Sequence, residues 1–255
     1  MTGSARRRTG DSRYGERVPL VAAAVCPHPP LLVPEVAGSA TPELDDLRTA
    51  CDTAVRRLLA ADPDRVVLLG TGPVTGPIRP PATGSLQPWG VDLDVPLVPG
   101  QPDRGAVLPL SLTIGAWLLA RHDARPSLSA VQVAADAGLA ELSALADEVS
   151  ATGDRVALLV LGDGSACRGE KSPGYDDPRA LPYDQRVAGA LADADLDVLL
   201  GLDPVVSAEL KAAGRAPWQV LASAARAAGG GWRGELLHDA APYGVAYFVA
   251  SWERV

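Results

Sequence analysis

Residues 18–36 read VPLVAAAVCPHPPLLVPEV, and this stretch decides how the rest of the chain is interpreted. Residues 18–25 are apolar throughout, as expected for a strand that is buried on both faces of a sheet. Prolines and His28 then interrupt the apolar run, so it falls short of the roughly twenty residues needed to cross a bilayer. The stretch therefore predicts a buried strand that ends in a rigid, proline-rich turn carrying one histidine.

Apolar segments alternate with helical segments along the rest of the chain. Short apolar runs predict buried strands at 65–69, 130–134 and 156–161, an alternating run predicts an edge strand at 91–98, and closing strands are expected at 235–237 and 245–251. Helical spacing predicts helices at 42–60, 107–121, 139–150, 179–192, 204–213 and 218–228. Thr41 is expected to cap the first helix, with Pro42 as its first residue. The alternation predicts an α/β fold, a central, mostly parallel or mixed sheet flanked by helices.

The chain is expected to fold as one domain over residues 18–255. Residues 1–17 are polar and rich in arginine, which predicts a disordered lead-in. No linker divides the remainder. Two irregular loops, 71–90 and 163–178, each follow the carboxyl end of a predicted buried strand. Ligands of open α/β sheets bind at such ends, so these loops are the first place to look for a site.

Charge and cysteine content narrow the classes of function. The formal net charge is −8, and the sequence has no basic stripe interleaved with aromatic residues, which argues against a nucleic-acid partner. No segment predicts a membrane span or a signal peptide. Cys26, Cys51 and Cys167 are far apart and form neither a zinc motif nor a disulfide framework. Reduced thiols of this kind favour a cytoplasmic protein.

His28 is the sharpest candidate for chemistry. Pro27 and Pro29 fix the backbone on either side of it, and it directly follows a predicted strand. A histidine in this place can bind a metal ion or move a proton, and it can equally be a side chain packed into a rigid turn.

The other histidines give fewer options. His238 and Asp239 precede the last strand and could supply one nitrogen and one oxygen ligand, or lie at the surface and cap a turn. His122 ends a helix, where a positive charge suits the helix dipole, and is interpreted as structural. A non-haem Fe(II) site needs two histidines and one carboxylate, so the only set with plausible convergence is His28, His238 and Asp239.

The segment GDGSACRG at 162–169 follows the predicted strand VALLVL. Its small residues allow a backbone to approach a ligand closely, although a tight turn explains them equally well. Cys167 within it would be a nucleophile if His28 came near, and is otherwise an unreactive thiol.

Three segments together resemble one known family. AAAVCPHPPLLVPEVAG (22–38), GDGSACRGEKSPGYDDPRALPYDQRV (162–187) and GELLHDAAPYGVAYFVA (234–250) are similar, in the same order, to the start, middle and end of the catalytic subunit of class III extradiol ring-cleavage dioxygenases, a superfamily related to the Memo proteins. The resemblance covers nearly the whole chain and implies the fold of that family, a central sheet flanked by helices.

The resemblance also implies that most functional positions are lost. His28 matches the first metal-binding histidine. Thr71 or Gly72 stands where the second is found, Ala166 replaces the acid/base histidine, and Ala240 replaces the metal-binding glutamate. One histidine does not hold Fe(II) in a facial triad, and loss of general acid–base catalysis alone costs about 10²–10⁴ in rate.

The expected function is therefore that of a non-catalytic or function-shifted homologue that binds a small molecule or a protein partner, without a resident cofactor. Besides His28, the expected residues of its cleft are Thr71, Gly72, Asp163, Ser165, Cys167 and Tyr243. A homo-oligomer is expected from the relatives.

The alternative is a metal-dependent oxygenase or other metalloenzyme, holding Fe(II) or another divalent metal with His28 and either His238 or Asp239. Side chains alternate along a strand. If residue 240 faces the site, His238 faces it too and Asp239 points away.

Overall fold

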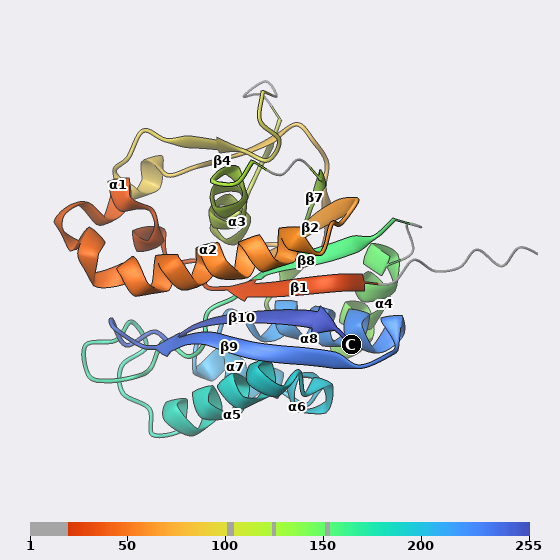
Figure 1. Ribbon diagram of the computed structural model, residues 1–255. Helices are drawn as coiled ribbons and strands as arrows, with labels where there is room; N and C mark the ends of the chain where they lie inside the picture. Colours follow the sequence, from red (N-terminus) through yellow and green to blue (C-terminus); the bar gives the residue numbers. More distant parts are fainter. Residues whose placement is uncertain (1–19, 101–104, 124–125, 151–153) are drawn as a thin grey trace, which may run out of the picture.

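The computed structural model describes residues 20–100, 105–123, 126–150 and 154–255. Its centre is a seven-stranded sheet with the order β3-β7-β2-β8-β1-β10-β9. Figure 1 shows this sheet between two layers of helices, so the predicted α/β class is confirmed. The strands are β1 (Leu20–Cys26), β2 (Arg65–Gly72), β3 (Gly76–Ile78), β7 (Ser127–Ala134), β8 (Val156–Leu161), β9 (Trp232–Ala240) and β10 (Tyr247–Arg254).

The sheet is mixed, with a parallel centre. Strands β7, β2, β8 and β1 run parallel to one another, whereas β10 is antiparallel to β1, β9 to β10, and β3 to β7. All six residues of β8 are buried, as expected for a continuous apolar strand covered on both faces. The four parallel strands end together at Cys26, Gly72, Ala134 and Leu161. We call this side of the molecule the carboxyl end of the sheet.

Helices cover both faces. The face on which Ala24 and Leu159 are buried is covered by α2 (Asp45–Ala60) and α3 (Leu110–Ala120), and the opposite face by α4 (Leu139–Ser150), α5 (Ala180–Asp193), α6 (Leu196–Leu200) and α8 (Arg215–Ala228). Each face buries its own apolar core of mainly alanine, valine and leucine. The described residues also form two short α-helices, α1 (Pro34–Ala37) and α7 (Pro204–Glu209). Among the described residues, no helix has the length and hydropathy of a membrane span.

The expected loop 71–90 contains more structure than its glycines and prolines predicted. Its first part forms the end of β2 and then β3, which pairs with β7 at the edge of the main sheet. Its second part forms β4 (Ala82–Ser85), which joins β5 (Asp94–Pro96) and β6 (Ala106–Val107) in a small sheet beside α3. The edge strand predicted at 91–98 is correspondingly reduced to three residues. Pairing with distant strands, which local sequence does not reveal, explains both differences.

The first predicted helix begins later than expected. Residues Gly38–Leu44 form a 3₁₀ stretch, and the α-helix starts at Asp45. The Thr41 hydroxyl donates to the Gly38 carbonyl at 2.7 Å and so does not cap the helix. Strands β9 and β10 are longer than predicted, and α6 was not predicted. The expected lead-in at 1–17 lies outside the described residues.

Candidate functional site

His28 lies at the carboxyl end of the sheet and is paired with Asp163. Strands β1 and β8 are neighbours in register, with Cys26 opposite Leu161, so the residues that follow them meet. The backbone N–H of His28 donates to Asp163 Oδ1 at 2.8 Å. The same oxygen lies 3.5 Å from Nδ1 of the His28 ring, and the two side chains are only 11% and 16% exposed. The sheet register thus places an imidazole beside a carboxylate.

The ring of His28 is not fully satisfied. Its Nδ1 atom is buried and has no hydrogen-bond partner. Buried polar atoms in folded proteins are nearly always paired, so an exception calls for an explanation. A small rotation towards Asp163 would convert the contact of 3.5 Å into a charge-assisted hydrogen bond. The carboxylate of Asp163 can therefore orient the imidazole.

Ser165 does not line a cleft, contrary to the expectation. It is fully buried, and both its backbone N–H and its hydroxyl donate to Asp184, at 2.8 and 2.6 Å. Arg168 donates to the same carboxylate at 3.2 Å. Burial raises the pKa of Asp184, and the hydrogen bonds from Ser165 and Arg168 oppose this rise. The role of Ser165 is to anchor the segment 162–169 to α5.

Cys167 is also buried, so the expectation that it lines the cleft is corrected. Its Sγ donates to the carbonyl of Leu210 at 3.4 Å, with a second contact at 3.6 Å to the carbonyl of Gly174. Burial raises the pKa of the thiol, and the negative charge of Asp177 raises it further. Both effects disfavour the thiolate, which is the nucleophilic form. The unreactive interpretation is the one that fits this environment.

Thr71 lines a cavity at the carboxyl ends of β2 and β7. Its hydroxyl donates to the carbonyl of Ala213 at 2.6 Å. The cavity has a volume of about 650 Å³, and most of its wall comes from α7 and the residues after it. It is lined by Thr71, Ala135, Asp136, Pro204, Val205, Ser207, Ala208, Glu209, Lys211, Ala212 and Ala213. We call it the Thr71 cavity.

Gly72, the second residue expected at this position, has a packing role. A Cβ atom on residue 72 would collide with the side chain of Gln132 on the neighbouring strand β7. The absence of a side chain therefore lets β2 and β7 pair to their ends.

His28 and Thr71 do not line one shared cleft. Strand β8 lies between β1 and β2, so the ends of the two strands are separated by about 10 Å, twice the usual strand spacing. His28 is not among the residues that line the Thr71 cavity. The segment 213–214 joins the two places, because Ala213 accepts from Thr71 while the Gly214 N–H donates to the Asp163 carbonyl at 2.8 Å. The predicted cleft is thus two adjoining sites.

Strand β9 places His238 and Asp239 on opposite faces, as strand alternation predicted. His238 pairs with Val249 and Ala240 with Tyr247, and both partners belong to the core under α2. Asp239 pairs with Phe248, whose side chain is buried in the core on the other face, and Asp239 itself is exposed. Burial lowers the pKa of His238, against the opposing charges of Asp239 and Asp46.

The residues present do not fit an Fe(II) triad. Over the described ranges, no three His, Cys, Asp or Glu side chains are grouped so that they could hold one metal ion. His28 has Asp163 beside it, whereas His238 lies two strands away from β1 and Asp239 faces the opposite side. A facial triad needs two histidines and one carboxylate around one point.

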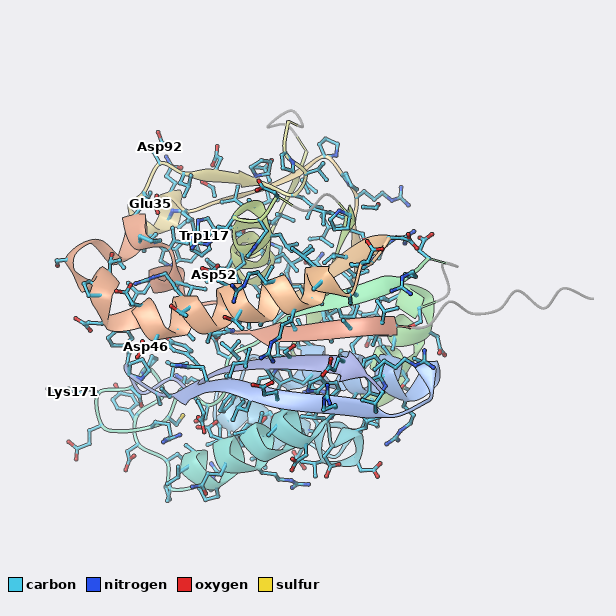
Figure 2. All side chains as sticks on the ribbon, in the orientation of Figure 1. Glu35, Asp46, Asp52, Asp92, Trp117 and Lys171 are labelled. Atoms are coloured by element: carbon cyan, nitrogen blue, oxygen red, sulfur yellow. The ribbon has the colours of Figure 1, made fainter. Side chains whose placement is uncertain are left out.

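Two tyrosines lie at the start of β10 and just before it. The Tyr243 hydroxyl donates to Glu43 at 2.8 Å near the surface, so this candidate is already engaged. Tyr247 is buried, and its pKa is raised by burial first and by the nearby Asp163 second. Figure 2 shows Asp46 of α2 and Lys171 of the loop 163–178 on the same side of the molecule, which marks the carboxyl end.

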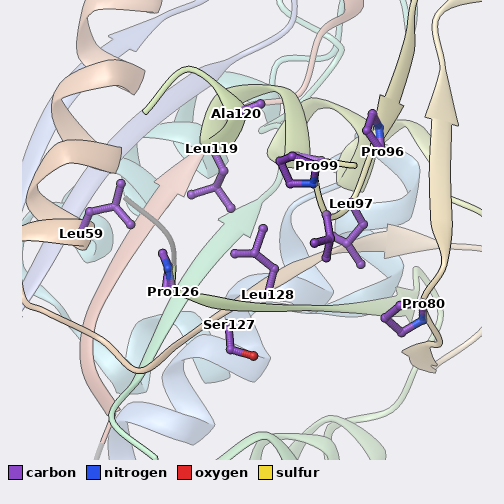
Figure 3. Close-up of a pocket in the computed structure, with 12 residues that line it drawn as sticks. Leu59, Pro80, Pro96, Leu97, Pro99, Leu119, Ala120, Pro126, Ser127 and Leu128 are labelled. Carbon is purple, nitrogen blue, oxygen red and sulfur yellow. The ribbon is translucent and has the colours of Figure 1, made fainter. Parts of the chain in front are cut away.

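A second large cavity lies away from this end. Figure 3 shows it beside the start of β7, with Leu59, Leu119 and Leu128 in its wall. Its volume is about 660 Å³, and the described residues that line it include no titratable side chain. These residues offer packing but no acid, base or charge, so the Thr71 cavity is taken as the candidate site.

Sequence reasoning missed most of the Thr71 cavity. The helix predicted at 204–213 is present as α7, which starts at Pro204 with the Asp203 carboxylate as its cap and ends earlier than predicted, at Glu209. Nothing in the local pattern placed that helix against the end of β2. Lys211, which also lines this cavity, carried no signal of its own in the sequence.

Comparisons with known proteins assign neither a family nor a function to this chain. No protein-family model matches the sequence, and no curated protein matches it. Among solved structures, the chain is similar to an uncharacterized protein from Escherichia coli K12, with 15% sequence identity and a TM-score of 0.45. The match covers 91% of this chain and 99% of the other.

Proposed function

We propose that this protein binds a small molecule at the carboxyl end of its sheet, as a function-shifted relative of the class III extradiol dioxygenases that does not cleave aromatic rings. The observation that carries the proposal is the Thr71 cavity. Its volume of about 650 Å³ lies within the range of roughly 300–1,000 Å³ typical of small-molecule sites. Alanine, valine and proline make up about half of its lining residues and polar or charged residues the rest, and it opens where open α/β sheets bind ligands.

The relationship to that superfamily is supported by where the matching segments lie. The segments 22–38, 162–187 and 234–250 come from β1, from the loop after β8, and from β9 and β10. Strand pairing brings all three together at the carboxyl end of the sheet. Segments that converge at one place would be expected if the family's site once stood there.

The absence of ring cleavage is supported by the chemistry of the replaced positions. Alanine at 166 and at 240 offers neither a proton donor nor a metal ligand. Thr71 already donates its hydroxyl proton to Ala213. His28 and Asp163 remain as a polar pair behind the cavity wall, where they hold the segment 213–214 in place through the Asp163 carbonyl.

Saturation-transfer NMR with catechol as a neutral probe tests the binding. Ala208 is exposed on α7 and lines the cavity, so Ala208→Phe fills the space without entering the core. Ala140→Phe, at an exposed position of α4, is the matched control. Catechol should receive saturation from the wild type and from the control, and lose it with Ala208→Phe. Equal transfer to all three proteins, or none to the wild type, would refute binding in this cavity.

An anaerobic calorimetric titration with Fe(II), with Zn(II) in parallel, tests the rest of the proposal. We expect no stoichiometric metal binding. One Fe(II) per chain, lost in His28→Ala and accompanied by consumption of catechol in air, would replace the proposal with the metalloenzyme alternative.

A further inference from the structure

Arg215 is a buried positive charge without a carboxylate partner. It is the first residue of α8 and only 3% exposed. Its Nη1 donates at 2.9 Å to the Ala137 carbonyl and at 2.9 Å to Gln219 Oε1, and its Nη2 donates to the Ala135 carbonyl. Its Nε atom is buried without any partner. In the part of the chain that the structure describes, no carboxylate lies within ion-pair distance of this guanidinium.

Such a charge is costly to bury. Neutral carbonyl groups solvate a guanidinium only partly, and an arginine stays protonated even where burial disfavours the charge. Burial lowers the pKa of Arg215, with opposing contributions from Tyr183 and then from the carboxylate of Asp136. A nearby anion that is itself shielded from water would offset the cost more fully than an exposed carboxylate does.

The guanidinium lies directly behind the wall of the Thr71 cavity. Ala135, which accepts a hydrogen bond from Arg215, lines the cavity, and so does Ala213, two residues before Arg215 in the chain. Helix α8 starts there, and no side chain caps its first turn at Gly214. The positive end of the helix dipole therefore adds to the charge of Arg215 on the same side of the cavity.

Lys211 supplies a second positive charge to the same wall. It lines the cavity, is exposed, and has a left-handed backbone with φ of 56°. Its ammonium group donates to the Pro173 carbonyl at 3.1 Å, which leaves two further donors. This backbone conformation costs energy in a residue other than glycine, and strain of this kind often accompanies a functional role.

The negative charges of the wall are those of Glu209 and Asp136. Glu209 lies 2.6 Å from Arg179, which is also paired with Asp177 at 2.7 Å, so this group of three carries one net negative charge. Asp136 is exposed and forms no ion pair within the described ranges. These negative charges equal Lys211 and Arg215 in number, but Glu209 and Asp136 are exposed to water whereas Arg215 is buried, and water screens an exposed charge more strongly than a buried one.

We infer that the Thr71 cavity takes an organic carboxylate with an apolar body. The body would occupy the space between the apolar residues of α7 and Ala135, and the carboxylate would lie at the side of Lys211 and Arg215. This inference rests on the proposed function and names the class of ligand that the same cavity selects. A charged hydrogen bond to Lys211 and the field of the buried Arg215 distinguish such an anion from a neutral molecule of equal size.

The test is a calorimetric comparison of decanoate with 1-decanol on the full chain. The two probes share an apolar body and differ in charge. We expect decanoate to bind at least about tenfold more tightly than 1-decanol, the effect of one charged hydrogen bond. Lys211→Gln keeps a side chain that can donate to Pro173 but removes the charge. It should weaken decanoate about tenfold and leave 1-decanol unchanged, whereas Ala208→Phe should abolish binding of both and Ala140→Phe of neither.

Arg215→Lys and Arg215→Met separate charge from packing, with thermal unfolding as the check that each variant folds. Arg215→Lys should retain the preference for decanoate, and Arg215→Met should lose it. If neither variant folds, the result with Lys211→Gln decides alone. If the wild type binds decanoate and 1-decanol equally well and Ala208→Phe binds neither, the inference is overturned and the proposed binding function stands. Failure of decanoate to bind a protein that binds catechol would overturn it as well.

Discussion

Replacing Asp184 tests whether this residue holds the loop 163–178 in place. Its carboxylate is 1% exposed and accepts three hydrogen bonds, two from Ser165 and one from Arg168. Asp184→Ala removes the acceptor and leaves both donors of the buried Ser165 without partners. The variant also leaves the partly exposed guanidinium of Arg168 without its carboxylate partner.

The size of the effect follows from the groups left unpaired. Each buried donor that loses its partner costs about 1–3 kcal/mol, so the two donors of Ser165 predict a loss of about 2–6 kcal/mol in the free energy of unfolding. Arg168 can turn towards water, so it adds little. Asp184→Asn keeps one carbonyl acceptor for the Ser165 N–H and is expected to cost less than Asp184→Ala.

Urea unfolding followed by circular dichroism measures the loss. Asp193→Ala, at an exposed position of the same helix, is the control and should change stability by less than about 0.5 kcal/mol. Hydrogen exchange should also show earlier opening of the segment 162–169 in Asp184→Ala. A loss below about 1 kcal/mol in Asp184→Ala would mean that Asp184 is not the anchor, since even one orphaned donor costs that much.

The pH dependence supplies an independent check. Burial raises the pKa of Asp184 above its ordinary value of 3.8, so the folded state holds this proton more readily than the unfolded state does. The stability that the protonated Asp184 contributes to the folded state is present at low pH and is lost as the pH rises through the folded-state pKa. Asp184→Asn cannot titrate and should lack this component of the pH profile.

Two further outcomes follow from burial. Because burial raises the pKa of the Cys167 thiol, iodoacetamide at neutral pH should label Cys167 in the folded protein much more slowly than in urea; equal rates would contradict its burial. Because burial lowers the pKa of His238, an NMR titration should place its midpoint below 6.5, and the stability that the neutral ring contributes should be present above pH 6.5 and decline as the pH falls through that midpoint. A midpoint at or above 6.5 would show that the ring is more solvated than its place on β9 indicates.

The central strands were predictable because they are buried on both faces. The run in 18–25 and the run VALLVL at 156–161 are apolar at every position. Short runs of this kind between helical segments indicate strands that are buried on both faces. The place of His28 followed from the same signal, since a residue just after a parallel strand must lie at the carboxyl end of the sheet. Its pairing with Asp163 did not follow, because it depends on which strand lies beside β1.

The cavity was not predictable from local pattern. Its wall combines the end of β2 with α7 and the residues after it, and Thr71 donates to Ala213 across a separation of 142 residues. The start of α2 was misplaced for a more local reason. Thr41 and Pro42 have the residue types of a helix start, but the Thr41 hydroxyl turns back to Gly38 and the stretch remains 3₁₀.

The loop after β8 is held in place by backbone hydrogen bonds that do not involve the side chain at position 166. Backbone hydrogen bonds tie this loop to the start of β10, with the Gly164 N–H donating to Ala246, the Ala246 N–H to Ser165, and the Arg168 N–H to Gly244, at 2.8 to 3.0 Å. Such bonds do not depend on the side chain at position 166, so alanine there leaves the loop in place. If the chain is the function-shifted relative proposed above, its functional side chains can change one at a time while the shape of the carboxyl end persists. A cavity with Lys211 in its wall and the buried Arg215 behind it then suits the anion inferred above better than the activation of oxygen.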